Sequence, residues 1–402
     1  MSKFNSNLSA TVTMIHIVSN IRNLDKFLKC FPWLASDPAA PGSDVEVSNI
    51  LHHLAAPQLV RAGHYDLVIA KVTSPGATVT EDREGNERPL LLGEWLVAPL
   101  IGRESNLGHS SILPLEGVAI GSIIDYISTG GGLGISPDNP AGMGDPTKVQ
   151  VLDILRYHDG RIARSLDFAI DVITRPDKKL SPVIAVIGSC SGAGKTTACI
   201  DLLRQFRRQV PKTAVAKLSG TMQKKEILEL AIHAAKGLDM ADAGLPTTTP
   251  PSQEDDDRAF FTVNQVLAAA DRNLRALSAD NDLIMVECGG DMLSASVPRL
   301  LEDPARLNIT ALIMVAETPT AAIGMETKLF RISERYESIP RYVVGPATNL
   351  QGNRNRVRRE TSCLGCYDIW TKHSEFAPEQ QIKLSEAHTE ELGRKLLKHC
   401  GL

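Results

Sequence analysis

Residues 183–203 contain the sequence feature that most constrains the fold of this chain. An apolar run, VIAVI, leads into the glycine-rich segment GSCSGAG, which is followed at once by KTT and the helical pattern ACIDLL. A strand, a tight loop and a helix N-terminus in this order gather backbone N–H groups and the positive end of the helix dipole around one point. The segment therefore predicts a strand–loop–helix unit whose loop binds a phosphate group.

The phosphate-binding loop predicts a role for each of its residues. Lys195 would reach the β- and γ-phosphates of a nucleotide, and the Thr196 hydroxyl would bind Mg²⁺. The strict pattern G-x-x-x-x-G-K-S/T expects glycine at position 189, where this chain has Ser189, with Gly188 one place earlier. The predicted nucleotide-binding residues are Gly188, Ser189, Cys190, Ser191, Gly192, Ala193, Gly194, Lys195, Thr196 and Thr197.

The second half of the chain alternates between strand-like and helical patterns. Strands are predicted at 183–187, 213–218, 282–287, 311–316 and 342–345. Helices are predicted after Gly194 and across 224–235, 259–277, 295–301 and 320–336. Alternation of this kind predicts an α/β fold with a mainly parallel sheet flanked by helices on both faces.

A polar, proline-flanked segment at 175–182 separates this half from the first one. We therefore expect two domains, residues 1–180 and residues 181–402. The first half predicts strands at 11–18 and 65–72 and helices at 24–30 and 47–62, and then becomes irregular and rich in Gly and Pro from 88 to 146. These patterns predict an N-terminal α/β domain of unassigned fold, which we expect to recognise the substrate.

Composition excludes several classes of function. The chain has 402 residues with 43 Lys plus Arg against 47 Asp plus Glu, a net charge of −4, which argues against binding of nucleic acid or of an anionic membrane. It contains no apolar run of 18 residues, so no transmembrane helix is predicted, and no signal peptide is recognised at the N-terminus. Seven scattered cysteines without a disulfide framework fit a cytoplasmic protein.

Three further strand ends carry polar residues in an ordered series. The segment AKLSGT contains Lys217, and DMADAG, with Asp242, follows it. A later strand ends in VECGGD, with Glu287, and the last one in VVGPATN, with Asn349. Together with the loop, this series resembles the dethiobiotin synthetase and cobyrinate diamide synthase group of P-loop enzymes and their uncharacterised relatives. That group has K-P-V-x-S/T-G and V-E-G-A-G-G at the corresponding strand ends, from which this chain departs.

The resemblance covers residues 183–350 and implies roles for these side chains. Glu287 would bind Mg²⁺ together with Thr196, and Asp242, or alternatively Asp239, would supply a second carboxylate to the metal. Lys217 would act with Lys195 as a catalytic residue at the reacting phosphate or substrate. Asn349 would hydrogen-bond an adenine edge, so that the cofactors are ATP and Mg²⁺.

The resemblance implies an ATP-dependent enzyme that activates a small-molecule carboxylate or carbamate by phosphoryl transfer for C–N bond formation. ADP and phosphate would be released, as by a ligase, and the protein would be a homodimer. The first alternative is a small-molecule kinase, and the second is an ATP-driven switch or assembly factor. A GTPase is disfavoured because no N/T-K-x-D tetrapeptide follows the last strand.

One pair of cysteines stands apart from this series. Cys363-Leu-Gly-Cys366 is a single C-x-x-C motif, whereas a tetrahedral zinc site needs four ligands and no further ligand follows at a standard spacing. We therefore predict two free thiols in a turn.

Overall fold

The computed structural model describes residues 15–34, 61–105, 108–175, 177–249, 257–294 and 296–402. By their contacts the residues form two compact units, each described here by itself. Unit 1 comprises Met1–Gly102 and Gly108–Ile170, and unit 2 comprises Arg103–Leu107 and Asp171–Leu402. The sequence places the boundary after residue 180. The short segment Arg103–Leu107, which belongs to unit 2, lies in the middle of the predicted first domain.

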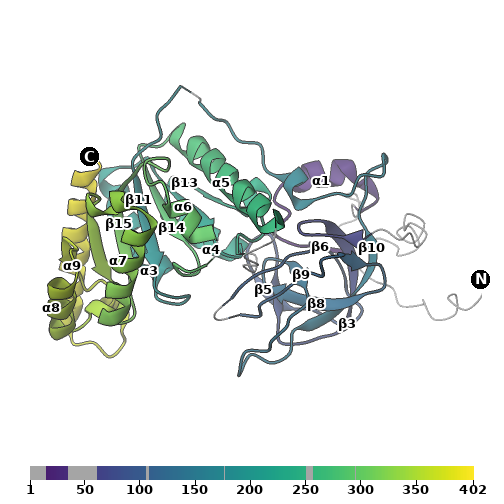
Figure 1. The fold of residues 1–402 in the computed structure, drawn as a ribbon, viewed down its shortest axis with the longest axis horizontal. Helices are drawn as coiled ribbons and strands as arrows, with labels where there is room; N and C mark the ends of the chain where they lie inside the picture. The colour runs from purple at the N-terminus through teal and green to yellow at the C-terminus, as the bar shows by residue number, and fades with distance from the viewer. Residues whose placement is uncertain (1–14, 35–60, 106–107, 176, 250–256, 295) are drawn as a thin grey trace, which may run out of the picture. The chain divides into compact units, whose positions relative to one another are not determined.

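Unit 1 is built on a six-stranded sheet with the order β1-β6-β3-β10-β8-β9 (Figure 1). In that order the strands are Ile15–Ile17, Trp95–Pro99, Leu67–Ser74, Thr147–Ile154, Ile123–Ser128 and Gly132–Gly134. Strand β1 pairs with β6 in parallel, and the other neighbours are antiparallel. Two short antiparallel ribbons join β2 (Arg61–Ala62) to β7 (Val118–Ala119) and β4 (Val79–Glu81) to β5 (Glu87–Pro89).

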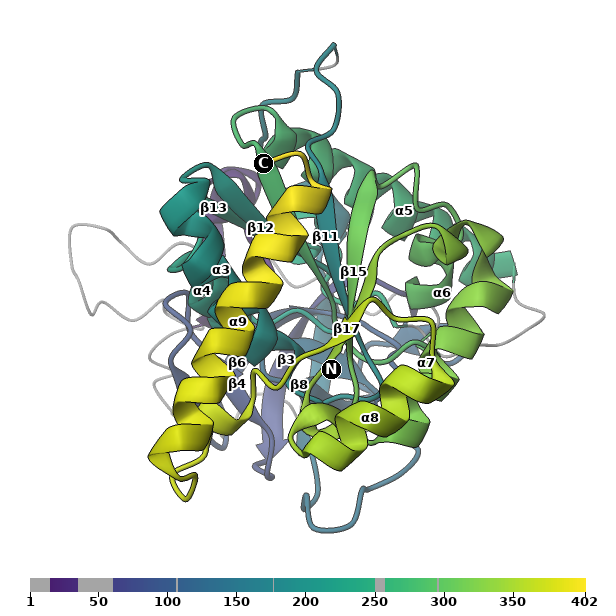
Figure 2. The same cartoon turned by 90° about the vertical axis from the view of Figure 1, so that its left-hand side faces the viewer.

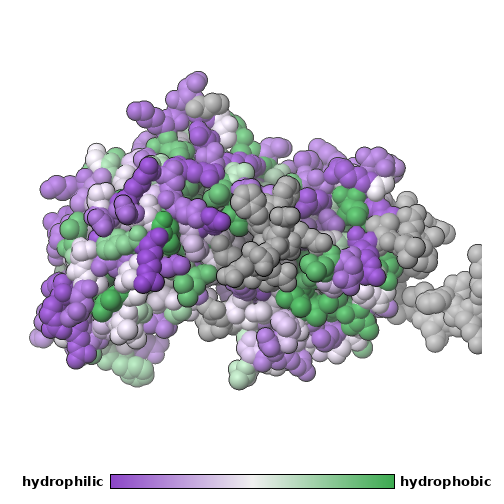
Figure 3. Space-filling model, viewed as in Figure 1, coloured by the Kyte–Doolittle hydropathy of each residue, from purple (hydrophilic) through white to green (hydrophobic). Residues whose placement is uncertain are grey.

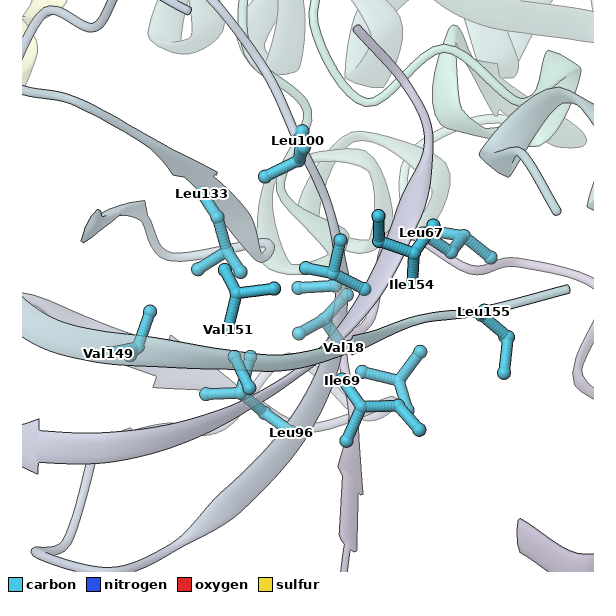
Figure 4. Packing of buried hydrophobic residues seen from close by; sticks show 14 of the residues in the cluster. Val18, Leu67, Ile69, Leu96, Leu100, Leu133, Val149, Val151, Ile154 and Leu155 are labelled. Atoms are coloured by element: carbon cyan, nitrogen blue, oxygen red, sulfur yellow. The ribbon is translucent and has the colours of Figure 1, made fainter. Parts of the chain in front are cut away.

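The core of unit 1 consists of branched aliphatic side chains from this sheet and aromatic side chains beside it. Figure 4 shows Val149 and Val151 of β10 together with Leu96 of β6, all of them fully buried. Helix α1 (Leu24–Cys30) adds Phe27, whose ring lies edge-on to Phe168 with centroids 5.0 Å apart. Burial of this kind stabilises the unit by about 25 cal/mol for each Å² of apolar surface removed from water.

The elements of unit 1 agree with the sequence in part. The predicted helix at 24–30 is confirmed as α1, and the predicted strand at 65–72 is confirmed as β3, two residues later. The segment 88–146 contains strands β6 to β9. Its sequence looks irregular because these strands are short and are separated by glycine turns. The predicted helix at 47–62 lies outside the described residues apart from 61–62, which form β2.

Unit 2 is a seven-stranded sheet with the order β13-β12-β14-β11-β15-β16-β17, and all its pairs are parallel. In that order the strands are Lys236–Asp239, Thr213–Ser219, Leu283–Cys288, Val183–Gly188, Ile309–Val315, Arg341–Val344 and Gly365–Cys366. Strands β11, β12 and β14 are buried along their whole length, as expected for central strands covered on both faces. The predicted α/β fold with a parallel sheet is confirmed.

Helices cover both faces of this sheet (Figures 1 and 2). On one face lie α3 (Lys195–Gln209), α4 (Lys224–Ala231) and α9 (Glu379–His399), which share an apolar core with the strands. On the other lie α5 (Asp257–Ser278), α6 (Ser296–Leu301) and α7 (Pro319–Ile332). The five predicted strands and five predicted helices of unit 2 are all present.

Four helices and strands of unit 2 have no counterpart among the predicted elements, and the parallel edge strand β13 is one of them. Helix α8 (Gln351–Glu360) and helix α9 follow the last predicted strand, with β17 between them. Helix α8 buries only Arg354 and Val357, and Figure 3 shows a mostly hydrophilic surface where Figure 1 draws it. Its apolar pattern is too sparse to indicate a helix. Within the part of the chain that is described, no helix has the length and apolar character needed to cross a bilayer.

Candidate functional site

The loop between β11 and α3 has the backbone geometry of a phosphate-binding loop. Gly192 and Gly194 have φ values of +79° and +97°, which a residue with a side chain rarely adopts. Ser189 is not among the residues with positive φ, so its position does not require glycine. Its N–H donates to the Val315 carbonyl at 3.0 Å and extends the pairing with β15. This explains how the loop tolerates serine where the strict pattern has glycine.

Lys195, the first residue of α3, folds back across the loop. Its Nζ donates to the Cys190 carbonyl at 2.8 Å and to the Gly290 carbonyl at 2.6 Å. Gly188 makes this position accessible, because a Cβ there would lie 2.7 Å from Nζ. The lysine is 5% exposed, and burial together with the neighbouring Lys217 lowers its pKa against the opposing effect of Glu287. The ammonium group is therefore held against backbone carbonyls at the phosphate-binding loop.

Glu287, at the end of β14, lies next to the loop. Its Oε1 accepts a hydrogen bond from the Thr196 hydroxyl at 3.1 Å, and its side chain is almost fully buried. Its Oε2 is also buried and has no hydrogen-bond partner among the described residues. A buried carboxylate oxygen of this kind costs free energy unless a cation or donor satisfies it. Thr196 and Glu287, two of the predicted metal ligands, thus lie together.

Lys217, at the end of β12, is placed between two carboxylates. Its Nζ lies 2.6 Å from Glu226 Oε2 and 3.5 Å from Glu287 Oε1. Burial alone would lower the pKa of Lys217, but the charges of Glu287 and Glu226 outweigh it and raise that pKa. Lys217 is therefore protonated at neutral pH. Its strand, β12, is separated by β14 from β11, the strand that leads to Lys195.

These side chains line one cavity of about 580 Å³, all of whose described lining residues belong to unit 2. One end of the cavity is the phosphate-binding loop with Lys195 and Thr196. Its lining also includes Lys217, Glu287 and the glycines after Glu287. A cavity of this volume is within the range that holds a small-molecule ligand or cofactor.

The cavity has walls that the sequence reading misses. Arg103, Glu104 and Ser105 form one of them, and the Glu104 N–H donates to the Thr249 carbonyl at 2.6 Å. Glu226, in the first turn of α4, forms another. No motif or spacing marks these residues, because they come from separate parts of the chain that only the fold brings together.

Trp370 closes the cavity beside the phosphate-binding loop. A Cβ added to Gly194 would lie 2.3 Å from Trp370 Cζ3, so the indole packs directly on the start of α3. Asp368 Oδ1 accepts from the Trp370 N–H at 3.1 Å and fixes the turn that carries it. The sequence offers no signal for this contact, since the turn follows the unpredicted strand β17.

Two predicted site residues away from the loop, Asp242 and Asn349, lie outside the described lining of the cavity. Asp242 Oδ2 accepts from the Asp239 N–H at 2.9 Å, while Asp239 Oδ1 accepts from the Asp242 N–H at 3.1 Å. This reciprocal pair closes the turn after β13. Asn349 follows β16, and its buried Oδ1 has no hydrogen-bond partner among the described residues. The structure therefore groups Lys195, Thr196, Lys217 and Glu287 but not Asp242 or Asn349.

The C-x-x-C pair carries two free thiols, with the Sγ atoms of Cys363 and Cys366 3.5 Å apart. The hydrogen bond between them lowers the pKa of Cys363. Over the described ranges, no group of three or more His, Cys, Asp or Glu side chains could hold a metal ion.

Comparisons with known proteins return structural similarity alone. No family model and no curated protein matches the chain. Among solved structures, the chain is similar to the signal recognition particle receptor FtsY from Elizabethkingia anophelis, with 16% sequence identity and a TM-score of 0.30. The match covers 54% of this chain and 66% of that chain. The chain is also similar to the hydrogenase maturation factor HypB from Archaeoglobus fulgidus, with 11% identity, coverage of 54% and 90%, and a TM-score of 0.33.

A third similar structure is a DUF1611 family protein from Anabaena variabilis, with 12% identity and a TM-score of 0.34. Here the match covers 56% of this chain and 62% of that chain. The chain thus spans less than two thirds of the FtsY structure and of the DUF1611 structure. Unit 2 itself has a P-loop fold, as its strand order, the geometry of the loop between β11 and α3 and the buried Lys195 show.

Proposed function

We propose that unit 2 binds Mg·ATP and transfers the γ-phosphoryl group to a small-molecule carboxylate or carbamate, which a nitrogen nucleophile then captures. The observation that carries this proposal is the position of Lys195, Thr196, Lys217 and Glu287 around one cavity at the phosphate-binding loop. Phosphoryl transfer needs positioning and charge neutralisation rather than covalent help from the protein. These four side chains supply cations, a hydroxyl and a carboxylate for that purpose.

The residues present fit a magnesium ion. Mg²⁺ prefers one or two carboxylates together with phosphate oxygens and water. The unpartnered Oε2 of Glu287 and the adjacent Thr196 hydroxyl are oxygen donors of that kind. Magnesium bound here would neutralise negative charge on the β- and γ-phosphates. Lys195 would contribute a second positive charge from the loop side.

The environment of Lys217 supports a carboxylate or carbamate acceptor. A hydroxyl acceptor has to lose a proton to a base, whereas a carboxylate is already an anion. The carboxylate Glu226 is engaged in an ion pair with Lys217 at 2.6 Å, while burial raises the pKa of Glu226 against the effect of that lysine. Lys217, kept protonated by its two carboxylate neighbours, would instead orient the anionic acceptor toward the γ-phosphate.

The proposed reaction proceeds in two steps. The acceptor oxygen attacks the γ-phosphorus, the bond to the β,γ-bridging oxygen breaks, and ADP leaves with the electron pair. The resulting acyl or carbamoyl phosphate is attacked at carbon by an amine, which loses a proton as inorganic phosphate departs. The C–N bond formed in this way gives the overall ligase-like reaction.

The choice of ATP is supported by the sequence after β16. A guanine-specific N/T-K-x-D tetrapeptide is absent from this part of the chain, and Asn349 stands at the strand end instead. The free Oδ1 of its amide is an acceptor suited to the exocyclic amino group of adenine. We propose this contact although Asn349 lies outside the described cavity lining.

Phosphorus NMR of the protein with Mg·ATP, in the presence and absence of a small-molecule cell extract, tests the proposal. We expect ADP and free phosphate to appear only with extract, and Lys195→Ala to abolish this turnover. Lys212→Ala is the matched control, because Lys212 is exposed at the protein surface. Normal turnover by Lys195→Ala would contradict the proposed site.

The same spectra separate the alternative functions. A new phosphoester signal that depends on extract would identify a small-molecule kinase. Release of ADP at a rate indifferent to extract would instead identify an ATP-driven switch or assembly factor. The proposed homodimer is checked separately by measuring the mass of the particle in solution by light scattering.

A further inference from the structure

The cavity of unit 2 extends well beyond the phosphate-binding loop. Its described lining residues on the far side come from the end of β12, the start of α4 and the segment around Thr249. None of the described lining residues belongs to β15 or β16, the strands next to Asn349. The proposed adenine contact, Asn349, lies at the end of β16. The acceptor would therefore occupy the part of the cavity next to the end of β12, on the other side of the phosphates.

The segment Arg103–Ser105 forms the outer wall of this space and is firmly attached to it. In addition to the bond from the Glu104 N–H, the Thr249 hydroxyl donates to the Glu104 carbonyl at 3.3 Å. Thr249 is itself fixed, because its hydroxyl lies 3.3 Å from the Thr247 hydroxyl, which lies 3.1 Å from that of Thr221. The segment is thus joined to the end of β12 through a chain of threonines.

Arg103 is the cation that this segment brings to the cavity, beside the acidic residue Glu104. Its side chain is 9% exposed, and its Nη2 donates to Ser105 Oγ at 2.9 Å. Burial lowers its pKa to about 10, against the opposing charge of Glu226, so the guanidinium remains protonated at neutral pH. A guanidinium binds a carboxylate through two parallel hydrogen bonds, and such contacts are strong where water is largely excluded.

We propose that Arg103 is the anchor of an acceptor subsite and binds a carboxylate of the substrate other than the group that receives the phosphoryl. The subsite rests on the function proposed above. Lys217 and Arg103 both line this cavity, and the charge of Glu226 acts on both of them, so a short acceptor in the cavity can meet two cations. The substrate class is therefore a small molecule with at least two anionic groups, such as a dicarboxylate or the carbamate of an amino acid.

The test uses the full chain and a small-molecule extract separated on an anion-exchange resin. The unbound fraction and the salt-eluted anionic fraction are each titrated against Mg·ATP turnover. We expect the anionic fraction alone to stimulate the wild-type protein. In Arg103→Gln, about tenfold more of that fraction should be needed for half-maximal stimulation, which is the effect of losing one charge-assisted hydrogen bond.

Two variants and one binding measurement control this experiment. Arg103→Lys keeps the charge but loses the planar fork, and should fall between the wild type and Arg103→Gln. Arg208→Gln, which changes an exposed arginine on α3, should match the wild type. In Arg103→Gln, Arg103→Lys and Arg208→Gln, the affinity for a fluorescent ADP analogue should stay within about twofold of the wild type. Neither Arg103 nor Arg208 is assigned to the nucleotide.

Each result decides between the two proposals. One outcome is that the anionic fraction stimulates the wild type and both Arg103 variants with the same half-maximal amount. In that case the subsite is wrong while the proposed function stands. Stimulation by the unbound fraction alone, or a loss of ADP affinity in Arg103→Gln, also overturns the subsite, the latter because Arg103 would then hold the nucleotide. If neither fraction stimulates the wild type, the proposed function fails and the subsite with it.

Discussion

Gly188 is the residue on which the position of Lys195 depends. A methyl group at this position would lie 2.7 Å from Lys195 Nζ and 2.8 Å from its Cδ, closer than non-bonded atoms approach. The residue has ordinary strand geometry, so the demand for glycine comes from the lysine side chain rather than from the backbone. The glycine that departs from the strict motif by one place therefore has a defined physical role.

Gly188→Ala should weaken nucleotide binding with little effect on folding. Displacement of the Lys195 ammonium removes a charge-assisted contact with phosphate, which corresponds to a loss of affinity of about tenfold. Titration with a fluorescent ADP analogue measures this loss. Gly324→Ala, at a position in α7 with open space around the added methyl group, should leave the affinity unchanged. Unaltered binding by Gly188→Ala would show that Lys195 does not need its observed position.

At the scale of elements, the start of α3 and the turn after β17 are fitted to each other. Gly194 precedes the first residue of α3 with a left-handed backbone, and Trp370 packs on the face where its side chain would be. The phosphate-binding loop is thereby supported by a segment near the other end of the unit. A loop that must hold several N–H groups toward one anion benefits from such support.

Gly194→Ala should destabilise unit 2 for two separable reasons. The positive φ costs about 1–2 kcal/mol for a residue with a Cβ, and the clash with Trp370 adds to that cost. Urea unfolding followed by circular dichroism measures the total. In the Trp370→Ala background the clash is absent, so the same glycine substitution should there cost only the backbone part. Equal costs in the two backgrounds would contradict the contact.

At the scale of the whole molecule, stability should depend on pH through two partly buried histidines of unit 1, His16 and His64. His64 accepts a hydrogen bond from the Gly102 N–H at Nδ1, with a distance of 3.1 Å. Burial lowers the pKa of His64 from 6.5 to about 3, and that of His16 from 6.5 to about 4. Both rings are therefore neutral in the folded protein at pH values where the unfolded chain would protonate them.

The free energy of unfolding of unit 1 should therefore fall as the pH decreases below about 6.5. Between that value and the lowered folded pKa, the unfolded state binds more protons, at up to about 1.4 kcal/mol per pH unit for each histidine. His64→Asn, whose Oδ1 can still accept from Gly102, should make this dependence shallower. The measurement is urea unfolding from pH 7 to pH 4 by tryptophan fluorescence in a Trp370→Phe background, where the remaining tryptophans lie outside unit 2. A slope unchanged by His64→Asn would refute the assignment.

The sequence by itself determined the elements whose information is local. The segment from Val183 to Thr197 carries its strand, its glycine turn and its helix start within a few residues, and the loop geometry agrees with that reading. The buried strands of unit 2 are equally readable, because strands covered on both faces must be continuous apolar runs. Lys217 and Glu287 could be identified because each stands at the end of such a strand.

Only the tertiary structure decided which other residues complete the cavity. Glu104, next to Arg103, meets Thr249 across 145 positions of chain, and Trp370 reaches Gly194 through a turn after an edge strand of two residues. Such contacts leave no periodicity or spacing in the sequence, since they arise from the packing of segments that are remote along the chain. The phosphate-binding half of the site is therefore encoded locally, whereas the half proposed to select the substrate exists only in the folded unit.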